Sequence, residues 1–247
     1  MPNPPTEPVA AVLFDFDGTL YVGDLPVHAY ARRVAEGLGG AAGVGVVAGM
    51  RRFMETRTVP GDPGTDLTAA EDGYQAVELL AIAAGADADL LSAAYRQSRH
   101  DLASSAFAVD APDGLVDLLT RLRGRVLFVV VSNADAAGVA EVLAGTGLAP
   151  LLHEVVLDAG KPDCWPFLIE RYAHLVGGPD RLLAVGDRWS GDLAPIAAAG
   201  GWTALIDRFG RGDGSPDARG ADLTALLPSI AGRIDRLTET SRPPRQR

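Results

Sequence analysis

Residues 9–20, VAAVLFDFDGTL, join an apolar run to two carboxylates that lie one residue apart. The run 9–14 is short and rich in strand-forming residues, which predicts a strand buried on both faces of a parallel sheet. Because side chains alternate along a strand, Asp15 and Asp17 leave its end on the same side. Two carboxylates this close repel one another, so the pair indicates a metal ion or a shared proton. Gly18 lets the backbone approach a ligand closely. An ordinary acidic turn is the simpler alternative, and it is excluded only if other parts of the chain supply partners.

The composition narrows the class of protein. The chain has 247 residues, of which 47% are hydrophobic, so it can hold one large α/β domain or a core domain with a smaller insert. A formal net charge of -10 argues against a nucleic-acid or anionic-membrane surface, since both favour basic patches. Cys164 is the only cysteine, so it cannot form an intrachain disulfide, and a reducing compartment is expected.

The sequence shows no targeting signal that we recognise. Residues 1–10 are proline-rich and have no basic region, unlike a signal or transit peptide. The longest uncharged run near them, residues 37–50, is shorter than the roughly 20 residues that a membrane span needs. We therefore expect a cytoplasmic protein with neither a membrane nor a nucleic-acid partner, and the sequence leaves a monomer and a homodimer equally open.

Residues 23–109 differ in pattern from the segments on either side. Apolar residues recur there at helical spacing, and Gly, Pro and Asp separate the helical segments. Four helices are predicted, at residues 27–38, 45–57, 71–84 and 88–107. Because no convincing strand interrupts them, we expect an α-helical subdomain inserted into a core of residues 9–22 and 110–235. Residues 236–247 are expected to form a disordered tail.

From residue 113 onward, helices and strands alternate. Strands are predicted at residues 126–131, 155–157, 182–185 and 202–206. Helices are predicted at residues 115–122, 136–143, 165–175 and 193–199. Repeated β-α units predict a Rossmann-like α/β core, with a parallel sheet covered by helices on both faces. In such sheets ligands bind at the carboxyl ends of the strands, which is where Asp15 and Asp17 are expected.

Two of the later strands also end in polar side chains. Ser132 and Asn133 follow the strand at 126–131 and could hold phosphate oxygens. Taken alone, they are more simply interpreted as a helix N-cap. Asp187 follows the strand at 182–185 beside a glycine, and Asp192, a little further along, could equally cap the next helix. These residues therefore add a hydroxyl, an amide and a second carboxylate pair to the predicted edge of the sheet.

Lys161 opens another predicted helix and is the only lysine among 22 Lys and Arg residues. A compact ammonium is suited to pairing with a carboxylate and a phosphate at once. If all these strand ends converge, oxygen ligands would bind a divalent cation, and Ser132, Lys161 and backbone amides would bind a phosphate.

These motifs resemble those of the haloacid dehalogenase (HAD) superfamily, whose hydrolases use an aspartate nucleophile. Residues 15–19, DFDGT, are similar to its first motif, and residues 132–133 to its second. Lys161 and Pro162 are similar to its third motif, and residues 186–192 to its GDxxxxD fourth motif. All four occur in the family's order. The helical insert is similar to the family's C1 cap, which closes over the active site and selects the substrate.

The resemblance implies catalytic roles for Asp15, Asp17 and Lys161. Asp15 would attack phosphorus to give an aspartyl phosphate, which divides one difficult hydrolysis into two easier displacements. Asp17 would protonate the leaving group and then deprotonate the attacking water. Ser132, Asn133 and Lys161 would stabilise the phosphate oxygens.

The resemblance also implies a bound Mg²⁺. Its ligands would be Asp15, the backbone carbonyl of Asp17, Asp187, and Asp192 either directly or through water. The expected function is therefore Mg²⁺-dependent hydrolysis of a small phosphate ester.

Single residues distinguish this sequence from several relatives that catalyse other reactions. Hydrolytic dehalogenases of the family lack the acid-base aspartate, so Asp17 argues against that reaction. Phosphonoacetaldehyde hydrolases need a cap lysine, and residues 23–109 contain none. Phosphosugar mutases retain both aspartates and are the alternative function. A non-catalytic binding protein of the same fold is disfavoured because no motif residue is missing.

The substrate is not indicated by the insert. Charged residues on small helices usually face solvent, so no role is assigned to Arg51, Arg52, Arg57, Tyr74, Arg96, Arg99 or His100. Arg188, at a position where a small polar residue is usual, is expected to pair with a surface acid rather than with substrate. Cys164 and Trp165 also depart from the family's pattern, and Cys164 is expected to have a packing or surface role.

Overall fold

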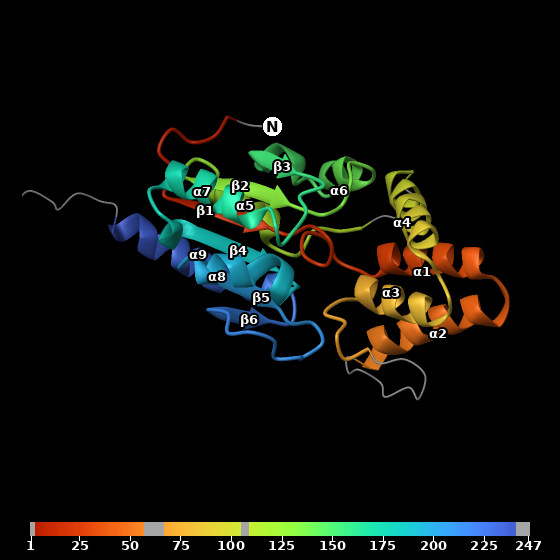
Figure 1. Ribbon diagram of the computed structural model, residues 1–247. Coiled ribbons are helices and arrows are strands. Elements are labelled where there is room, and N and C mark those ends of the chain that lie inside the picture. Colours follow the sequence, from red (N-terminus) through yellow and green to blue (C-terminus); the bar gives the residue numbers. More distant parts are fainter. Residues whose placement is uncertain (1–2, 57–66, 105–108, 241–247) are drawn as a thin grey trace, which may run out of the picture.

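The computed structural model describes residues 3–56, 67–104 and 109–240. At its centre is a six-stranded sheet with the strand order β3-β2-β1-β4-β5-β6, shown in Figure 1. Every neighbouring pair is parallel. The strands are β1 (Ala10–Phe14), β2 (Val126–Val131), β3 (Glu154–Val156), β4 (Leu182–Gly186), β5 (Trp202–Ile206) and β6 (Ala218–Gly220). The predicted α/β fold with a parallel Rossmann-like sheet is confirmed.

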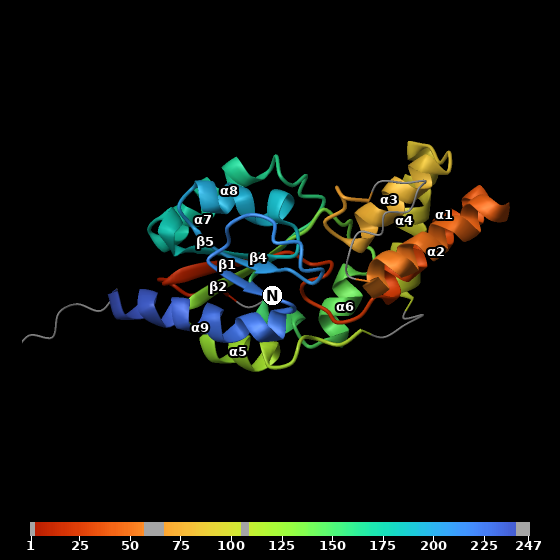
Figure 2. The ribbon, with the colours of Figure 1, turned by 90° about the horizontal axis from the view of Figure 1, so that it is seen from below.

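The central strand β1 explains why the sheet needs helices on both faces. All of its side chains are buried, and alternation sends Ala10, Val12 and Phe14 into one core and Ala11 and Leu13 into the other. Figure 2 shows the two layers, with α7 and α8 on one side of the sheet and α5 and α9 on the other. These helices are α5 (Leu115–Leu122), α7 (Trp165–Val176), α8 (Ala194–Ala198) and α9 (Leu223–Thr240). Helix α6 (Val139–Gly145) adds buried side chains to the same core as α5 and α9.

The helices between β1 and β2 form a unit with its own apolar core, which we name the helical insert. It comprises α1 (Leu25–Leu38), α2 (Gly40–Thr56), α3 (Gly73–Ala83) and α4 (Ala88–Ala103). Buried side chains such as Val34, Met50 and Val77 fill its centre. In Figure 1 the insert lies beyond the ends to which the arrowheads of the central strands point. It therefore lies over the carboxyl edge of the sheet, where ligands are expected.

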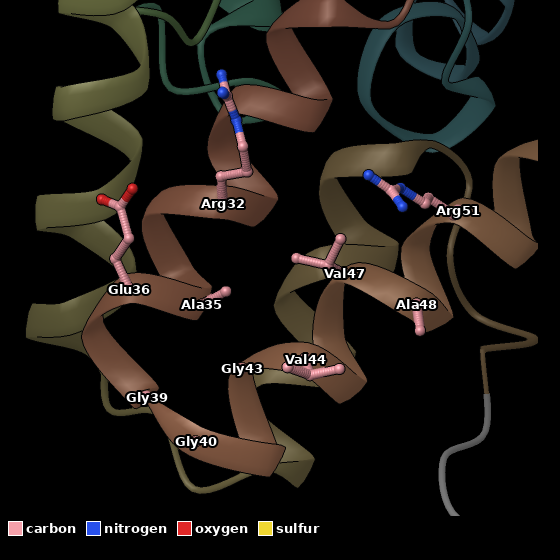
Figure 3. A pocket seen from close by; sticks show the side chains of 10 residues that line it. All are labelled: Arg32, Ala35, Glu36, Gly39, Gly40, Gly43, Val44, Val47, Ala48 and Arg51. Atoms are coloured by element: carbon pink, nitrogen blue, oxygen red, sulfur yellow. The ribbon is translucent and has the colours of Figure 1, made fainter.

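The first two helices of the insert pack closely against each other. Gly43 lies against the backbone of Ala35, where an added Cβ would overlap the carbonyl oxygen. A hollow of about 450 Å³ lies between the two helices, and Figure 3 shows its lining, which includes Arg32, Glu36, Val44 and Arg51. None of its lining residues belongs to the group around the strand-end carboxylates, so this hollow is separate from the predicted site.

The two chain segments that join the insert to the sheet lie side by side. Val22 and Asp110 form an isolated antiparallel bridge, in which the Val22 N–H donates to the Asp110 carbonyl oxygen at 2.8 Å. The chain therefore enters and leaves the insert at one place.

The C-terminal elements differ from the sequence prediction. Neither β6 nor α9 was predicted, and α9 carries Pro228 in its interior. The helix continues to Thr240, so the tail predicted from residue 236 is wrong for residues 236–240, whereas residues 241–247 lie outside the described part. The helix predicted at residues 88–107 ends at Ala103, and residues 57 and 105–107 of the predicted helices lie outside the described part. Neither α9 nor any other helix of the described residues is both long and apolar enough to cross a membrane.

Candidate active site

The polar strand ends meet at the carboxyl edge of the sheet. Asp15 follows β1 and Asp187 follows the neighbouring β4, and the Asp15 N–H donates to the Val185 carbonyl oxygen at 2.9 Å. Ser132 follows β2, and its N–H donates to the Val156 carbonyl oxygen at 2.9 Å. A cavity of about 250 Å³ lies between these strand ends and the helical insert. Every site residue predicted from the sequence lines it: Asp15, Asp17, Ser132, Asn133, Lys161, Asp187 and Asp192.

Lys161 joins two of the carboxylates. Its ammonium lies 2.6 Å from Asp15 Oδ1 and 2.6 Å from Asp192 Oδ1, and all three side chains are at most 10% exposed. Burial opposes the positive charge, but the two carboxylates outweigh it and raise the pKa of Lys161. Burial is also the main reason why the pKa of Asp15 rises to about 7, because Lys161 only partly offsets it. The lysine is therefore charged and holds Asp15 in a fixed orientation.

Asp187 has no such partner. Its Oδ1 atom is buried and makes no hydrogen bond with any residue that the structure describes. Burial, with the nearby Asp15 as the next cause, raises the pKa of Asp187 well above its ordinary value. Gly18, at φ +79°, makes room for this carboxylate, because an added Cβ would overlap Asp187 Oδ2. From the sequence we predicted that Gly18 allows a ligand to approach the backbone closely. In the structure the group that lies against Gly18 is the Asp187 side chain.

The acid cluster fits a divalent cation. Asp15, Asp187 and Asp192 each offer an oxygen, and these atoms lie within 4.8 Å of one another. Carboxylate oxygens are the ligands that Mg²⁺ prefers, and a buried carboxylate oxygen without a donor is a position where a cation would replace the missing partner. The side chain of Asp17 is not part of this cluster. Asp17 could therefore bind the ion only through its backbone carbonyl.

The Asp17 carboxylate instead accepts hydrogen bonds from aromatic and basic side chains. Asp17 Oδ1 accepts from the Tyr21 hydroxyl at 2.6 Å and from Arg99 Nη1 at 2.8 Å. The Tyr74 hydroxyl lies 3.5 Å away, at the limit of a hydrogen bond. Asp15 and Asp17 therefore lie in different surroundings although only Phe16 separates them.

Arg99 and Tyr74 were given no role from the sequence, and both reach the site from the helical insert. Arg99 is 1% exposed, and its guanidinium lies over the Phe16 ring at 5.4 Å. Its Nη2 atom is buried and has no hydrogen-bond partner within the described part of the chain. The sequence feature that could have indicated a role for Arg99 is its helical spacing. Tyr95, Arg99 and Leu102 follow one another at intervals of four and three, which places the arginine on the inward face of α4.

Ser132 and Asn133 hold the loops around the site. The buried Ser132 hydroxyl accepts from the Ala134 N–H at 3.0 Å, and its own proton has no hydrogen-bond acceptor among the described residues. Asn133 bonds the backbone of Lys161 in both directions, since its Oδ1 accepts from the Lys161 N–H at 2.7 Å and its Nδ2 donates to the Lys161 carbonyl at 3.1 Å. Asn133 thus positions the segment that carries the lysine.

Arg188 lies at the contact between sheet and insert. Its Nε atom is 3.7 Å from Glu71 Oε2 and 3.7 Å from Asp72 Oδ2, and both acid side chains are 13% exposed. Arg188 therefore faces two largely buried acids of the helical insert, whereas the sequence predicted a surface acid. Ser190 adds to this contact, because its hydroxyl donates to Glu71 Oε2 at 2.6 Å.

Trp165, which departs from the family's usual pattern, links two of the motifs. Its buried indole N–H donates to the Gly191 carbonyl oxygen at 2.7 Å, between the Lys161 segment and Asp192. Cys164 beside it is a partly exposed free cysteine, and burial raises the pKa of its thiol. The large side chain at position 165 therefore supports the loop that carries Asp192.

Further contacts dock the helical insert onto the loop after β5. Arg211 donates to the carbonyl oxygens of Ala70 and, at 3.0 Å, of Thr68. Arg208 pairs with Asp24, and the Phe53 and Phe209 rings lie 4.8 Å apart. Together with Arg99 and Ser190, these contacts hold the insert against the cavity.

Comparisons with known proteins agree with this geometry. The family model described as haloacid dehalogenase-like hydrolase matches residues 9–200. The search of curated proteins gives no match. Among solved structures, the chain is similar to a predicted phosphoglycolate phosphatase from Haemophilus somnus 129PT, with 19% identity, a TM-score of 0.58, and coverage of 90% of this chain and 97% of that one.

Two other similar structures differ in what their names state. The HAD hydrolase YfnB from Bacillus subtilis, described as bound to magnesium and showing interdomain movement, has 18% identity and a TM-score of 0.55, with 92% of this chain and 100% of that one covered. A 2-haloacid dehalogenase from Pseudomonas syringae pv. tomato DC3000 has 22% identity and a TM-score of 0.52, with 91% and 98% covered. The family match over most of the chain, on a parallel sheet with carboxylates at its carboxyl edge, shows that this protein belongs to the haloacid dehalogenase-like hydrolases.

Proposed function

We propose that the protein is a Mg²⁺-dependent phosphomonoester hydrolase that acts on a small phosphorylated metabolite through an aspartyl-phosphate intermediate. The observation that carries the proposal is the different environment of Asp15 and Asp17, which lie one residue apart. Asp15 is bonded to Lys161 and borders the acid cluster, whereas Asp17 is bonded to Tyr21 and Arg99. Carboxylates in different surroundings can divide the roles of nucleophile and general acid-base between them.

Asp17 also favours a phosphatase over a dehalogenase. The similar solved structures include proteins named for both activities, so the fold alone supports neither. The resemblance to the HAD superfamily implies that its hydrolytic dehalogenases lack an aspartate at this position. A general acid is useful for an alcohol leaving group, which needs a proton, whereas a halide leaves without one.

Asp15, Asp187, Asp192 and the carbonyl of Asp17 would hold the Mg²⁺. When bound, the ion would offset the repulsion between the nucleophile and the phosphate. Two observations on the described residues support an ion that prefers hard oxygen ligands. The Asp187 Oδ1 atom has no hydrogen-bond partner among them, and the acid cluster consists of aspartates without His or Cys.

In the first step Asp15 would attack phosphorus. Lys161 donates to Oδ1 at 2.6 Å, whereas the bond that Oδ2 accepts from the described residues is a longer one from Thr19, at 3.3 Å, so Oδ2 is the less engaged oxygen. As the bond from Asp15 to phosphorus forms, the bond from phosphorus to the alcohol oxygen breaks. The departing oxygen keeps the electron pair and takes a proton from Asp17.

In the second step water would attack the phosphorus of the aspartyl phosphate. Asp17 accepts a proton from that water, the bond between phosphorus and Asp15 breaks, and inorganic phosphate leaves. Lys161 and the Ser132 hydroxyl can donate to the phosphate oxygens in both steps, where charge develops. Both steps need Asp17 within reach, so Arg99 must share the carboxylate with the reacting groups.

Phosphate release from p-nitrophenyl phosphate and from small alkyl phosphates tests the proposal. We expect turnover with Mg²⁺, none after chelation, and none for an Asp15→Asn variant purified in parallel as the control for contaminating phosphatases. Chloride release from a 2-chloroalkanoate without phosphate release would contradict the proposal. Transfer of phosphate between two hydroxyls of a sugar phosphate, without free phosphate, would instead indicate a mutase.

A further inference from the structure

We propose that the insert side of the cavity recognises a positively charged group, so that the substrate is a small phosphate ester whose alcohol carries an ammonium. This inference rests on the proposed phosphatase function and specifies its substrate class. Three tyrosines and one glutamate, Tyr30, Tyr74, Tyr95 and Glu78, form the wall concerned, which we name the tyrosine wall.

The tyrosine wall is built from three different helices of the insert. Tyr30 belongs to α1, Tyr74 to α3 and Tyr95 to α4, and each ring contacts the other two. The ring centroids lie 5.8 Å apart for Tyr30 and Tyr74, 5.8 Å for Tyr30 and Tyr95, and 6.1 Å for Tyr74 and Tyr95. All three line the same cavity as Asp15 and Asp187. A ligand in this cavity therefore meets aromatic side chains opposite the strand ends.

The tyrosine wall lies next to the point where the alcohol would leave. The Tyr74 hydroxyl is 3.5 Å from Asp17 Oδ1, and Asp17 is the residue proposed to protonate the leaving oxygen. The cavity holds about 250 Å³ in all, part of which the phosphate would fill. The alcohol portion must therefore be small, and any charge on it lies within a few bonds of the phosphate.

The balance of charge on the insert side is negative. Among the described residues that line the cavity, the insert contributes the carboxylates of Asp72 and Glu78 and no cation, and the nearest cation to them is Arg188, from the segment after β4. Glu71 and Asp72 lie 3.7 Å from its Nε, whereas Glu78, at the rim, makes no ion pair with any described residue. The other nearby cations are already balanced, since Lys161 pairs with Asp15 and Asp192, and Arg99 pairs with Asp17.

These features together select for a cation. An anionic group would be repelled by the excess of carboxylates, and an apolar group would remove water from them without replacing its hydrogen bonds. A positive group would gain attraction from the ring faces and from Glu78 at once. Phosphorylated amino alcohols combine such a group with a phosphate at short distance.

Matched esters test the inference. The probes are phosphocholine, phosphoethanolamine, the uncharged carbon isostere dimethylbutyl phosphate, and an ester of equal length that ends in a carboxylate. We expect kcat/KM for phosphocholine or phosphoethanolamine to exceed that for the uncharged isostere by about tenfold or more, the range expected for a cation held by rings and a carboxylate. The carboxylate ester should be the poorest substrate.

Two variants assign the preference to the wall. Glu78→Gln, at an exposed rim position, should bring the ratio of kcat/KM for the cationic ester to that for the isostere towards one, and Tyr95→Leu should also reduce it. Glu36→Gln, in the separate hollow of Figure 3, is the matched control and should leave the ratio unchanged.

The outcomes separate this inference from the proposed function. Hydrolysis of p-nitrophenyl phosphate with equal or better use of the uncharged or carboxylate ester would overturn the inference alone. So would a cationic preference that Glu78→Gln leaves intact. Failure to hydrolyse any phosphate ester would overturn both.

Discussion

The Arg99 guanidinium, from the last helix of the insert, lies 2.8 Å from the Asp17 carboxylate at the end of β1. Arg99 is almost fully buried, and the Asp17 side chain is 19% exposed. This ion pair joins the two parts of the molecule at a residue proposed to transfer protons. Docking of the insert and the geometry of Asp17 are therefore coupled.

That coupling can be measured by a double-mutant cycle with Arg99→Leu and Asp17→Asn. Because the pair is charged and mostly shielded from water, its coupling to the free energy of unfolding should be about 2 kcal/mol. The Arg33 and Asp101 pair within the insert is more exposed and should give less than about 1 kcal/mol. Equal coupling for both pairs in urea titrations would contradict a special role for Arg99.

Substitutions of Asp15 and Asp17 should have different effects on activity. Asp15→Asn should abolish turnover, because no neighbouring side chain can form the phosphoenzyme in its place. Asp17→Asn should reduce hydrolysis of alkyl phosphates by roughly 10² to 10⁴-fold, the usual contribution of general acid-base catalysis. An activated ester needs little protonation, so this variant should accumulate phosphoenzyme from p-nitrophenyl phosphate, which mass spectrometry detects. Wild-type rates for Asp17→Asn with both ester classes would refute the assigned roles.

Asp187→Asn should change stability in opposite directions with and without Mg²⁺. In the presence of a chelator, the free energy of unfolding of the variant should exceed that of the wild type by about 1 kcal/mol, because a buried carboxylate without a hydrogen-bond donor is removed. With Mg²⁺ at about 100 times its dissociation constant, the wild type should gain about 2.7 kcal/mol, and the variant much less. The exposed Asp117→Asn is the control. An undiminished Mg²⁺ effect in Asp187→Asn would exclude Asp187 as a ligand.

Gly18→Ala should impair activity far more than its backbone strain explains. Gly18 and Gly114 both have φ +79°, so alanine is strained at either position. At Gly18 the new Cβ would also overlap the Asp187 carboxylate, whereas at Gly114 it meets only Leu227 at an ordinary contact distance. Denaturation should show similar losses of stability, but only Gly18→Ala should lose on the order of 10²-fold in kcat/KM. Equal activities would show that the Asp187 carboxylate can move without consequence.

The parts of the site that could be predicted are those set by short-range sequence. Asp15, Ser132 and Asp187 each follow an apolar strand directly, so a parallel sheet is enough to bring them together. Lys161 was recognised because it is the only lysine, although its two carboxylate partners depend on how its loop folds.

The contributions of the helical insert could not be predicted in the same way. Arg99, Tyr74 and Glu71 reach the site only because of how the insert docks, which depends on distant contacts such as those of Arg211 with the loop before α3. Their position along a helix indicates which face they occupy but not what that face meets. In α9 the residues Leu223, Leu226 and Ile230 follow helical spacing, although Pro228 lies within the helix, where proline removes a backbone hydrogen bond.

The bridge between Val22 and Asp110 has a consequence for how such a protein can change. Because these two residues are hydrogen bonded, cutting out everything between them leaves two chain ends that are already adjacent. A short turn can rejoin them, and an insert from another relative can be grafted at the same junction. The carboxylates of the sheet would stay in register during such an exchange, while the wall facing them would be replaced as a whole. The insert can therefore be exchanged as one unit, but a grafted insert must supply a new partner for Asp17 in place of Arg99.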